Sequence, residues 1–275
     1  MKNVTIRTIS GIGFVLVMLA CLLWSQWLFG ALVIFMMVGM MSEFYTITMG
    51  DRYKVSRALA ILAGVILFSL IYLAAAYRMP VKYVALSIVP VMVVMINSLY
   101  VEDKTDYSKF SNLYTGLIYI AVPLALSNLV AFRNGHFSGM LLVSFFVLIW
   151  SSDIGAYIFG MALGQKYGKK LFPSVSPQKT WIGYWGGMLF SILAAHILNL
   201  TGMLSLPMFH SVMLAIVMHV AGVYGDLFES QWKRINGIKD SGTIIPGHGG
   251  LLDRFDSTLL AMPVGALYLS LFDLL

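Results

Sequence analysis

The chain has 275 residues, of which 59% are hydrophobic and only 11% are charged, and its formal net charge is +6. Soluble globular chains carry about 25% charged residues, so this composition excludes a water-facing globular surface and indicates an integral membrane protein. The single cysteine, Cys21, excludes an internal disulfide and a cysteine-rich metal site. The positive charge is typical of membrane proteins, whose Lys and Arg residues collect on the cytoplasmic side, so no nucleic-acid partner is expected.

About nine apolar segments approach the ~20 residues that a helix needs to cross the hydrocarbon core of a bilayer. In chain order they cover roughly 9–24, 28–48, 58–77, 83–100, 113–132, 138–162, 182–200, 209–232 and 256–274. Backbone groups have no water partner in the core, so each segment is predicted to be helical, and continuous apolar runs such as 89–95 argue against a β-barrel. The fold class predicted is therefore all-α, a polytopic transmembrane helical bundle that forms a single integral membrane domain over residues 1–275.

The basic residues predict the orientation of this bundle. With the N-terminus in the cytoplasm, only Arg78, Lys82 and Arg133 fall on the far side, and all other Lys and Arg residues lie on the cytoplasmic side. This asymmetry follows the positive-inside rule and favours a cytoplasmic N-terminus with an odd number of spans. The first span is not expected to be a cleavable signal peptide, because no small-residue cleavage site follows it.

Acidic residues lie within several predicted spans, where ionisable groups are costly and usually face a cavity or a partner. Glu43 lies one turn from the cytoplasmic end of its span, so it either reaches the interface or contributes to a site. Asp153 follows two serines, which fits a site contact or a structural hydrogen bond.

A stripe of polar residues marks the eighth predicted span. Asp226, Glu229, Ser230 and Lys233 are spaced to lie on one helical face. Such a stripe fits a site that faces the bundle interior, and it also fits an interhelical salt-bridge seam.

The segment that follows the stripe combines glycines, acids and bases. Glycines recur from residue 237 to 250 and allow the backbone to approach a ligand closely. Asp253 and Asp256 are spaced to share a face as the last helix begins, and with Asp226 they offer the oxygen ligands that Mg²⁺ takes alongside substrate phosphates. The bases suited to neutralising phosphate charge are Lys233, Arg234, Lys239 and Arg254. A solvated loop with positive-inside anchors would explain these bases, but neither the acids nor the glycines.

An earlier polar segment, 163–181, brings hydroxyls and cations near a membrane surface and suits phosphate or ribose contacts. It lacks the Walker spacing, so a P-loop is not expected. No histidines are spaced as a zinc pair, and only His248 lies in the polar motif.

The polar residues resemble the pattern of a known family. The signature of phosphatidate cytidylyltransferases, also called CDP-diacylglycerol synthases, is matched by Ser230, Lys233-Arg234, Lys239-Asp240, Pro246, His248-Gly249-Gly250, Asp253-Arg254 and Asp256. A second block of that family is similar to Ser176-Pro177, Lys179-Thr180 and Gly183, with Gln178 where lysine is commoner, and a third is similar to Asp153, Ala156-Tyr157 and Gly160. The resemblance covers most of the chain and is specific from about residue 150 onward, so residues 1–137 are expected to be less specific helices and 138–275 to carry the catalytic helices and loops.

The resemblance implies a Mg²⁺-dependent reaction of CTP with phosphatidic acid that gives CDP-diacylglycerol and pyrophosphate in phospholipid biosynthesis. The metal ligands implied are Asp226, Asp253 and Asp256, which hold two divalent ions or one together with a monovalent cation. The catalytic residues implied are Asp226, Lys233, Arg234, Lys239, Asp240, His248, Asp253, Arg254 and Asp256. The substrate-binding residues implied are Asp153, Ser176, Pro177, Lys179, Thr180, Glu229, Ser230, Gly249 and Gly250.

The expected setting is the inner (plasma) membrane, crossed several times, with the active site on the cytoplasmic side, and a homodimer is left open. Two alternatives remain. A CTP-dependent lipid-alcohol kinase, such as a polyprenol or phytol kinase, would release CDP and not pyrophosphate. An ion-coupled transporter would use Asp153 and Asp226 as intramembrane acids, but the paired broken helices and inverted repeats common in transporters are not found in the sequence.

Overall fold

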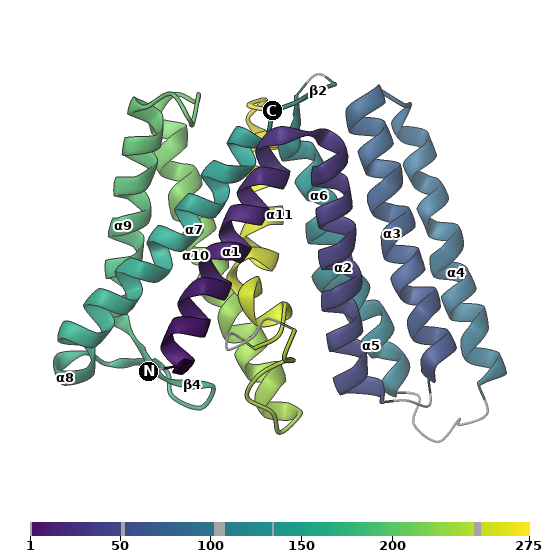
Figure 1. Ribbon diagram of the computed structural model, residues 1–275, viewed down its shortest axis with the longest axis horizontal. Coiled ribbons are helices and arrows are strands. Elements are labelled where there is room, and N and C mark those ends of the chain that lie inside the picture. The colour runs from purple at the N-terminus through teal and green to yellow at the C-terminus, as the bar shows by residue number, and fades with distance from the viewer. Residues whose placement is uncertain (1, 51–52, 102–107, 134, 245–248) are drawn as a thin grey trace. The chain divides into compact units, whose positions relative to one another are not determined.

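The structure is a computed structural model that describes residues 2–50, 53–101, 108–133, 135–244 and 249–275, of which 2–9 and 108 are described by their backbone (Figure 1). The chain divides into two compact units. The first comprises Met1–Ser138 and Asp240–Arg254, and the second comprises Gly139–Lys239 and Phe255–Leu275. The prediction of a single integral membrane domain stays a prediction.

The protein is a helical, multi-pass membrane protein. Within the described ranges, seven segments are long and apolar enough to cross a membrane, namely Gln26–Met49, Lys54–Tyr77, Val81–Tyr100, Lys109–Ala131, Gly139–Tyr167, Trp181–Leu200 and Met208–Ile235. Two shorter apolar helices, Ser10–Trp24 and Asp256–Leu271, coincide with the first and last predicted spans. The helical class is therefore confirmed, whereas the number of about nine spans and the cytoplasmic N-terminus stay predictions.

The first unit consists of helices and one short hairpin. Its α-helices are α1 (Lys2–Trp24), α2 (Gln26–Met49), α3 (Lys54–Tyr77), α4 (Ile88–Asn97), α5 (Ser108–Gly116) and α6 (Val122–Ala131). Tighter or wider turns form the 3-10 helices η2 (Val81–Ser87), η3 (Ser98–Tyr100) and η6 (Leu252–Arg254) and the π-helix η4 (Leu117–Ala121). Strands β1 (Phe132–Arg133) and β2 (His136–Phe137) pair antiparallel.

Helix α2 contributes a row of buried side chains to this unit. Ser25 caps its N-terminus by accepting a hydrogen bond from the backbone N–H of Trp27 at 3.2 Å. Met37, Met40 and Phe44, which recur at helical spacing, are fully buried. The neighbouring Tyr45 is also buried and donates its hydroxyl to the carbonyl oxygen of Leu113 at 2.8 Å, which ties α2 to α5.

The second unit contains three long helices and one hairpin. Its elements are α7 (Gly139–Phe159), the π-helix η5 (Gly160–Gly164), α8 (Gln165–Tyr167), β3 (Lys170–Phe172), β4 (Ser176–Thr180), α9 (Trp181–Leu200), α10 (Met208–Ile235) and α11 (Asp256–Leu271). Strands β3 and β4 pair antiparallel and connect α8 to α9. The short β1–β2 and β3–β4 hairpins were missed by the all-α prediction, because segments so short carry no alternating apolar pattern.

Small residues let α7 and α9 pack closely. A Cβ added at Gly155 would lie 2.6 Å from the carbonyl oxygen of Gly186, and one added at Gly187 would lie 2.8 Å from that of Ser152. Membrane helices associate through such close backbone approach, since lipid supplies no hydrophobic drive between them. This contact holds the Ser152 region of α7 against α9.

Candidate active site

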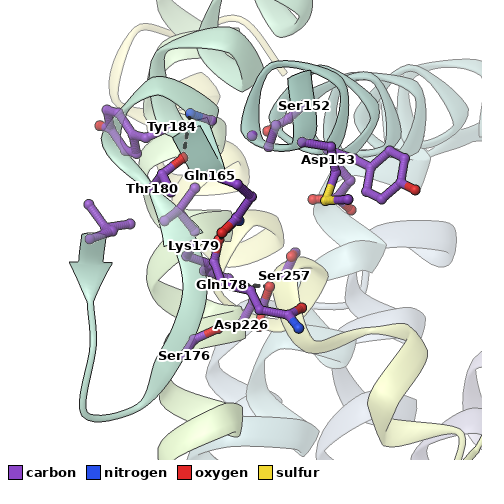
Figure 2. Close-up of a pocket in the computed structure, with 17 residues that line it drawn as sticks. Ser152, Asp153, Gln165, Ser176, Gln178, Lys179, Thr180, Tyr184, Asp226 and Ser257 are labelled. Carbon is purple, nitrogen blue, oxygen red and sulfur yellow. Dashed lines mark hydrogen bonds and ion pairs between the residues drawn. The ribbon is translucent and has the colours of Figure 1, made fainter. Parts of the chain in front are cut away.

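A cavity of about 390 Å³ lies within the second unit (Figure 2). This volume falls in the usual range of ligand pockets, about 300–1,000 Å³. The polar residues that line it are Ser152, Asp153, Gln165, Ser176, Gln178, Lys179, Thr180, Tyr184, Asp226 and Ser257. They come from five of the unit's helices and from β4. The two family-like blocks, residues 153–160 and 176–183, therefore meet Asp226 of the eighth predicted span at one place.

An ion pair between Lys179 of β4 and Asp226 of α10 lies in the cavity, and both residues are drawn in Figure 2. Lys179 Nζ lies 2.5 Å from Asp226 Oδ2, with the two side chains 25% and 30% exposed. The other oxygen of Asp226, Oδ1, accepts a hydrogen bond from Ser230 at 3.2 Å. Partial burial strengthens this pair relative to one in open water, because the local dielectric constant is lower.

Three acids of the second unit interact electrostatically. Asp153 and Asp256 are both close enough to Asp226 to repel its charge, and Lys179 partly offsets the repulsion. Carboxylate oxygens are the ligands that Mg²⁺ prefers, so this donor set fits a divalent cation in chemical type. Across the described ranges, however, no three His, Cys, Asp or Glu side chains stand at metal-ligand spacing. The metal assignments therefore stay predictions.

The β3–β4 hairpin is held beside the cavity by local hydrogen bonds. Thr180 is buried, and its hydroxyl accepts a bond from the backbone N–H of Gly183 at 3.1 Å, which caps the N-terminus of α9. Gln165 of α8 donates its amide to the carbonyl oxygen of Gln178 at 2.7 Å. Thr180 thus has a structural task in addition to lining the cavity, whereas Pro177 is exposed on β4.

The predicted stripe on α10 divides into two pairs. Asp226 and Ser230 bond to each other at the cavity, whereas Glu229 is fully buried and pairs with Lys233 at 3.0 Å. The interpretation as a purely structural seam does not account for Asp226, which lines the cavity.

Helix α10 ends at Ile235 with a glycine turn. Gly237 has a φ of 67°, and its N–H bonds the carbonyl oxygen of Arg234 at 3.1 Å. The turn leaves Arg234 and Lys239 exposed at the end of the helix.

The sequence patterns did not predict that His219 contacts residues of the cavity wall. It is buried on α10, its Nδ1 lies 2.7 Å from the hydroxyl of Ser152, and its ring lies 4.7 Å from that of Tyr184. Both partners line the cavity. An intramembrane histidine is the only sequence signal that could have indicated it.

The motif loop, residues 240–254, belongs to the first unit. Oδ2 of Asp253 accepts hydrogen bonds from the backbone N–H groups of Ser241 and Gly250, each at 2.8 Å. Gly249 has a φ of 84°, a conformation that favours glycine. Asp240 and Arg254 are exposed, and His248 lies outside the described residues.

The prediction that Asp253 and Asp256 share a helical face is wrong. Asp253 lies in η6, and α11 begins only at Asp256. The two backbone bonds to its carboxylate hold Asp253 in the loop, so helical spacing does not apply between these two residues.

The fold and the cavity define a polytopic helical membrane protein in which acids, hydroxyls and a lysine converge within one group of helices. A family model described as "Cytidylyltransferase family" matches residues 5–272, so the chain belongs to the cytidylyltransferase family.

Curated relatives agree with this membership. The chain is 34% identical to a phosphatidate cytidylyltransferase of Bacillus subtilis over 71% of this chain and 70% of that protein. It is 34% identical to one of Rickettsia bellii over 78% of this chain and 91% of that protein. It is 37% identical to one of Staphylococcus epidermidis over 57% of this chain and 60% of that protein. The resemblance read from the motif residues is confirmed.

Proposed function

We propose that this protein transfers CMP from CTP to phosphatidic acid, giving CDP-diacylglycerol and pyrophosphate in phospholipid biosynthesis. The observation that carries the proposal is the convergence of Lys179, Asp226 and Asp153 in one cavity of the membrane-spanning second unit. In such an arrangement the lysine suits the oxygens of a phosphate, and the carboxylates suit the metal cation that accompanies a nucleotide triphosphate. The names of the relatives point to the same reaction.

The reaction joins two anions, so charge neutralisation and positioning are its main requirements. A phosphate oxygen of the lipid attacks the α-phosphorus of CTP, the bond between that phosphorus and the bridging oxygen breaks, and pyrophosphate leaves with the electron pair. Phosphatidic acid is already ionised near neutral pH, so no general base is required. Lys179 neutralises phosphate charge in the cavity, and Ser176 and Thr180 contribute hydroxyls beside it.

Mg²⁺ is the cofactor proposed, because the acids of the cavity are of the type that holds it beside substrate phosphates. Asp226 and Asp256 are the ligands proposed within the second unit, with Asp153 close to both. The ion would supply charge neutralisation at the reacting phosphates. Lys179 pairs with the same carboxylate, Asp226. The part of Asp253, and the choice between two divalent ions and one with a monovalent cation, stay predictions.

The remaining basic residues of the signature are proposed to bind phosphate. Lys233, Arg234 and Lys239 lie at or just after the C-terminal end of α10. Arg234 and Lys239 are exposed there, and Arg254 is exposed in the motif loop. Their roles, and that of His248, rest on the family pattern.

The membrane setting follows from the two substrates. Phosphatidic acid keeps its acyl chains in the bilayer, whereas CTP arrives from water, so the reaction centre is proposed to lie at the cytoplasmic face of the inner (plasma) membrane. Tyr157 and Met161 line the cavity and are 69% and 59% exposed. Exposed apolar residues in a membrane-spanning segment face acyl chains, which supports entry of the lipid from the side.

The test is a transfer assay with the purified full-length chain, labelled CTP, phosphatidic acid in detergent micelles and Mg²⁺. We expect label to enter the lipid with equimolar pyrophosphate, and chelation of the metal to stop it. In a parallel assay with CTP labelled in the cytidine and a polyprenol in place of phosphatidic acid, release of CDP with an unlabelled phosphorylated alcohol would instead establish a kinase. Solute flux into vesicles without nucleotide consumption would establish a transporter. Either result would overturn the proposal.

A further inference from the structure

Glu43 of α2 lies buried against the motif loop. It is 8% exposed, and both of its carboxylate oxygens accept hydrogen bonds. Oε1 accepts from the backbone N–H of Leu251 at 2.8 Å, and Oε2 accepts from the backbone N–H of Leu252 at 2.9 Å and from the hydroxyl of Ser241 at 3.1 Å. These partners are 198 to 209 residues away in sequence, so Glu43 joins an N-terminal helix to a distant loop.

Glycines let the loop close around this carboxylate. A Cβ added at Gly242 would lie 2.6 Å from Oε1 of Glu43, and one added at Gly250 would lie 2.7 Å from Oε2. A side chain at either position would force the loop and the Glu43 carboxylate apart. At Gly250 the added Cβ would also clash with the Ser241 hydroxyl and with the backbone nitrogen of Gly242. The close packing around Glu43 thus gives both glycines a structural reason.

A second carboxylate holds the same loop from within. Ser241 and Gly250 donate their N–H groups to Asp253, while the Ser241 hydroxyl and the N–H groups of Leu251 and Leu252 bond to Glu43. The two carboxylates thus share Ser241 and adjacent backbone of residues 250–252. Movement of Glu43 would release the neighbouring donors that hold Asp253.

We propose that Glu43 is a positioning residue of the transferase: it holds Ser241 and residues 250–252 of the motif loop in the conformation in which they also bond Asp253, and the transfer reaction depends on that conformation. The role rests on the proposed function. Glu43 acts through the loop backbone and its carboxylate is already engaged by three donors, so it is assigned no contact with substrate. Its location beneath the loop explains an intramembrane acid that the cavity does not use.

The discriminating variant is Glu43→Gln. A carboxylate only accepts, whereas the amide of Gln replaces one acceptor with a donor that would face an N–H group. We expect amide hydrogen exchange in the described part of the loop, 249–254, to accelerate by about tenfold or more, the change that ~1.4 kcal/mol produces. We expect kcat to fall by a similar factor in folded enzyme. Glu43→Asp keeps the charge but has a shorter side chain, so we expect its loop exchange rate and its kcat to lie between those of Glu43→Gln and the wild type.

Tyr45→Phe is the matched control. It removes a buried hydrogen bond from the same helix, but to Leu113 and not to the loop. We expect this variant to lower the melting temperature while kcat and loop exchange stay as in the wild type. If its kcat falls in parallel with that of Glu43→Gln, damage to α2 explains both and the positioning role is refuted.

The remaining outcomes are also decisive. Unchanged loop exchange in folded Glu43→Gln would overturn the proposal, and so would faster exchange with unchanged kcat. If Glu43→Gln does not fold, Ser241→Ala replaces it, because this variant keeps the two backbone bonds from Leu251 and Leu252 to Glu43. We then expect loop exchange to rise and kcat to fall by about twofold to threefold. If either quantity stays as in the wild type, the proposal is refuted. Loop exchange is measured without CTP or lipid, so it tests the Glu43 contacts even when the transfer assay fails.

Discussion

Breaking the ion pair between Lys179 and Asp226 should separate catalysis from folding. At 2.5 Å and an effective dielectric constant of about 20, two unit charges attract by about 7 kcal/mol before desolvation. Desolvation offsets most of this attraction, and the side chains are about a quarter exposed, so the net coupling should lie between that of surface and buried pairs, at about 1–3 kcal/mol. Asp226→Asn still accepts the Ser230 bond, so the helix should remain folded.

The effect on turnover should be much larger than the effect on stability. Removal of one preorganised charge from a reaction centre typically costs a factor of about 10²–10³ in kcat. We expect Lys179→Met to lose about that much. Asp226→Asn should lose more, because it removes a proposed metal ligand and the partner of Lys179. The double variant should be no worse than Asp226→Asn alone, since residues that act as a unit are not additive.

The assay combines lipid labelling from CTP with thermal unfolding of the purified variants. Asp273→Asn is the matched control, because it makes the same chemical change at an exposed position outside the cavity. Near-normal turnover of folded Asp226→Asn would refute the metal assignment. A melting temperature lowered in proportion to lost activity would instead indicate that the pair is a structural seam.

Two further predictions concern the support of the cavity. Thr180→Ala should destabilise the protein by about 1 kcal/mol by removing the N-cap of α9, and Thr180→Ser should restore the melting temperature; equal melting temperatures for all three proteins would contradict the cap. Gly155→Ala should cost about 1–3 kcal/mol through overpacking against α9. Gly13→Ala, whose added Cβ meets nothing within 4 Å, is its control in the same thermal assay, and equal stability of the two variants would refute the close-packing argument.

The composition and the apolar runs were sufficient to predict a multi-pass helical membrane protein. A chain with so few charges cannot coat a water-facing surface, and backbone in hydrocarbon must satisfy its own hydrogen bonds. The motif residues were also sufficient to predict the family, because a motif is a pattern of residue types that is read directly from the sequence. The β3–β4 hairpin could not be predicted in this way, since its short polar strands carry no periodic signal.

Which polar residues meet was decided only by the tertiary structure. Helical spacing alone allows Glu229 to pair with Lys233 one turn later. Only packing brings Lys179 of β4 to Asp226 in the cavity. Spacing also suggested a helical pair of Asp253 and Asp256, whereas backbone hydrogen bonds hold Asp253 in the loop. Glu43 finds its partners some 200 residues away, and such contacts depend on how helices pack, which local sequence patterns do not encode.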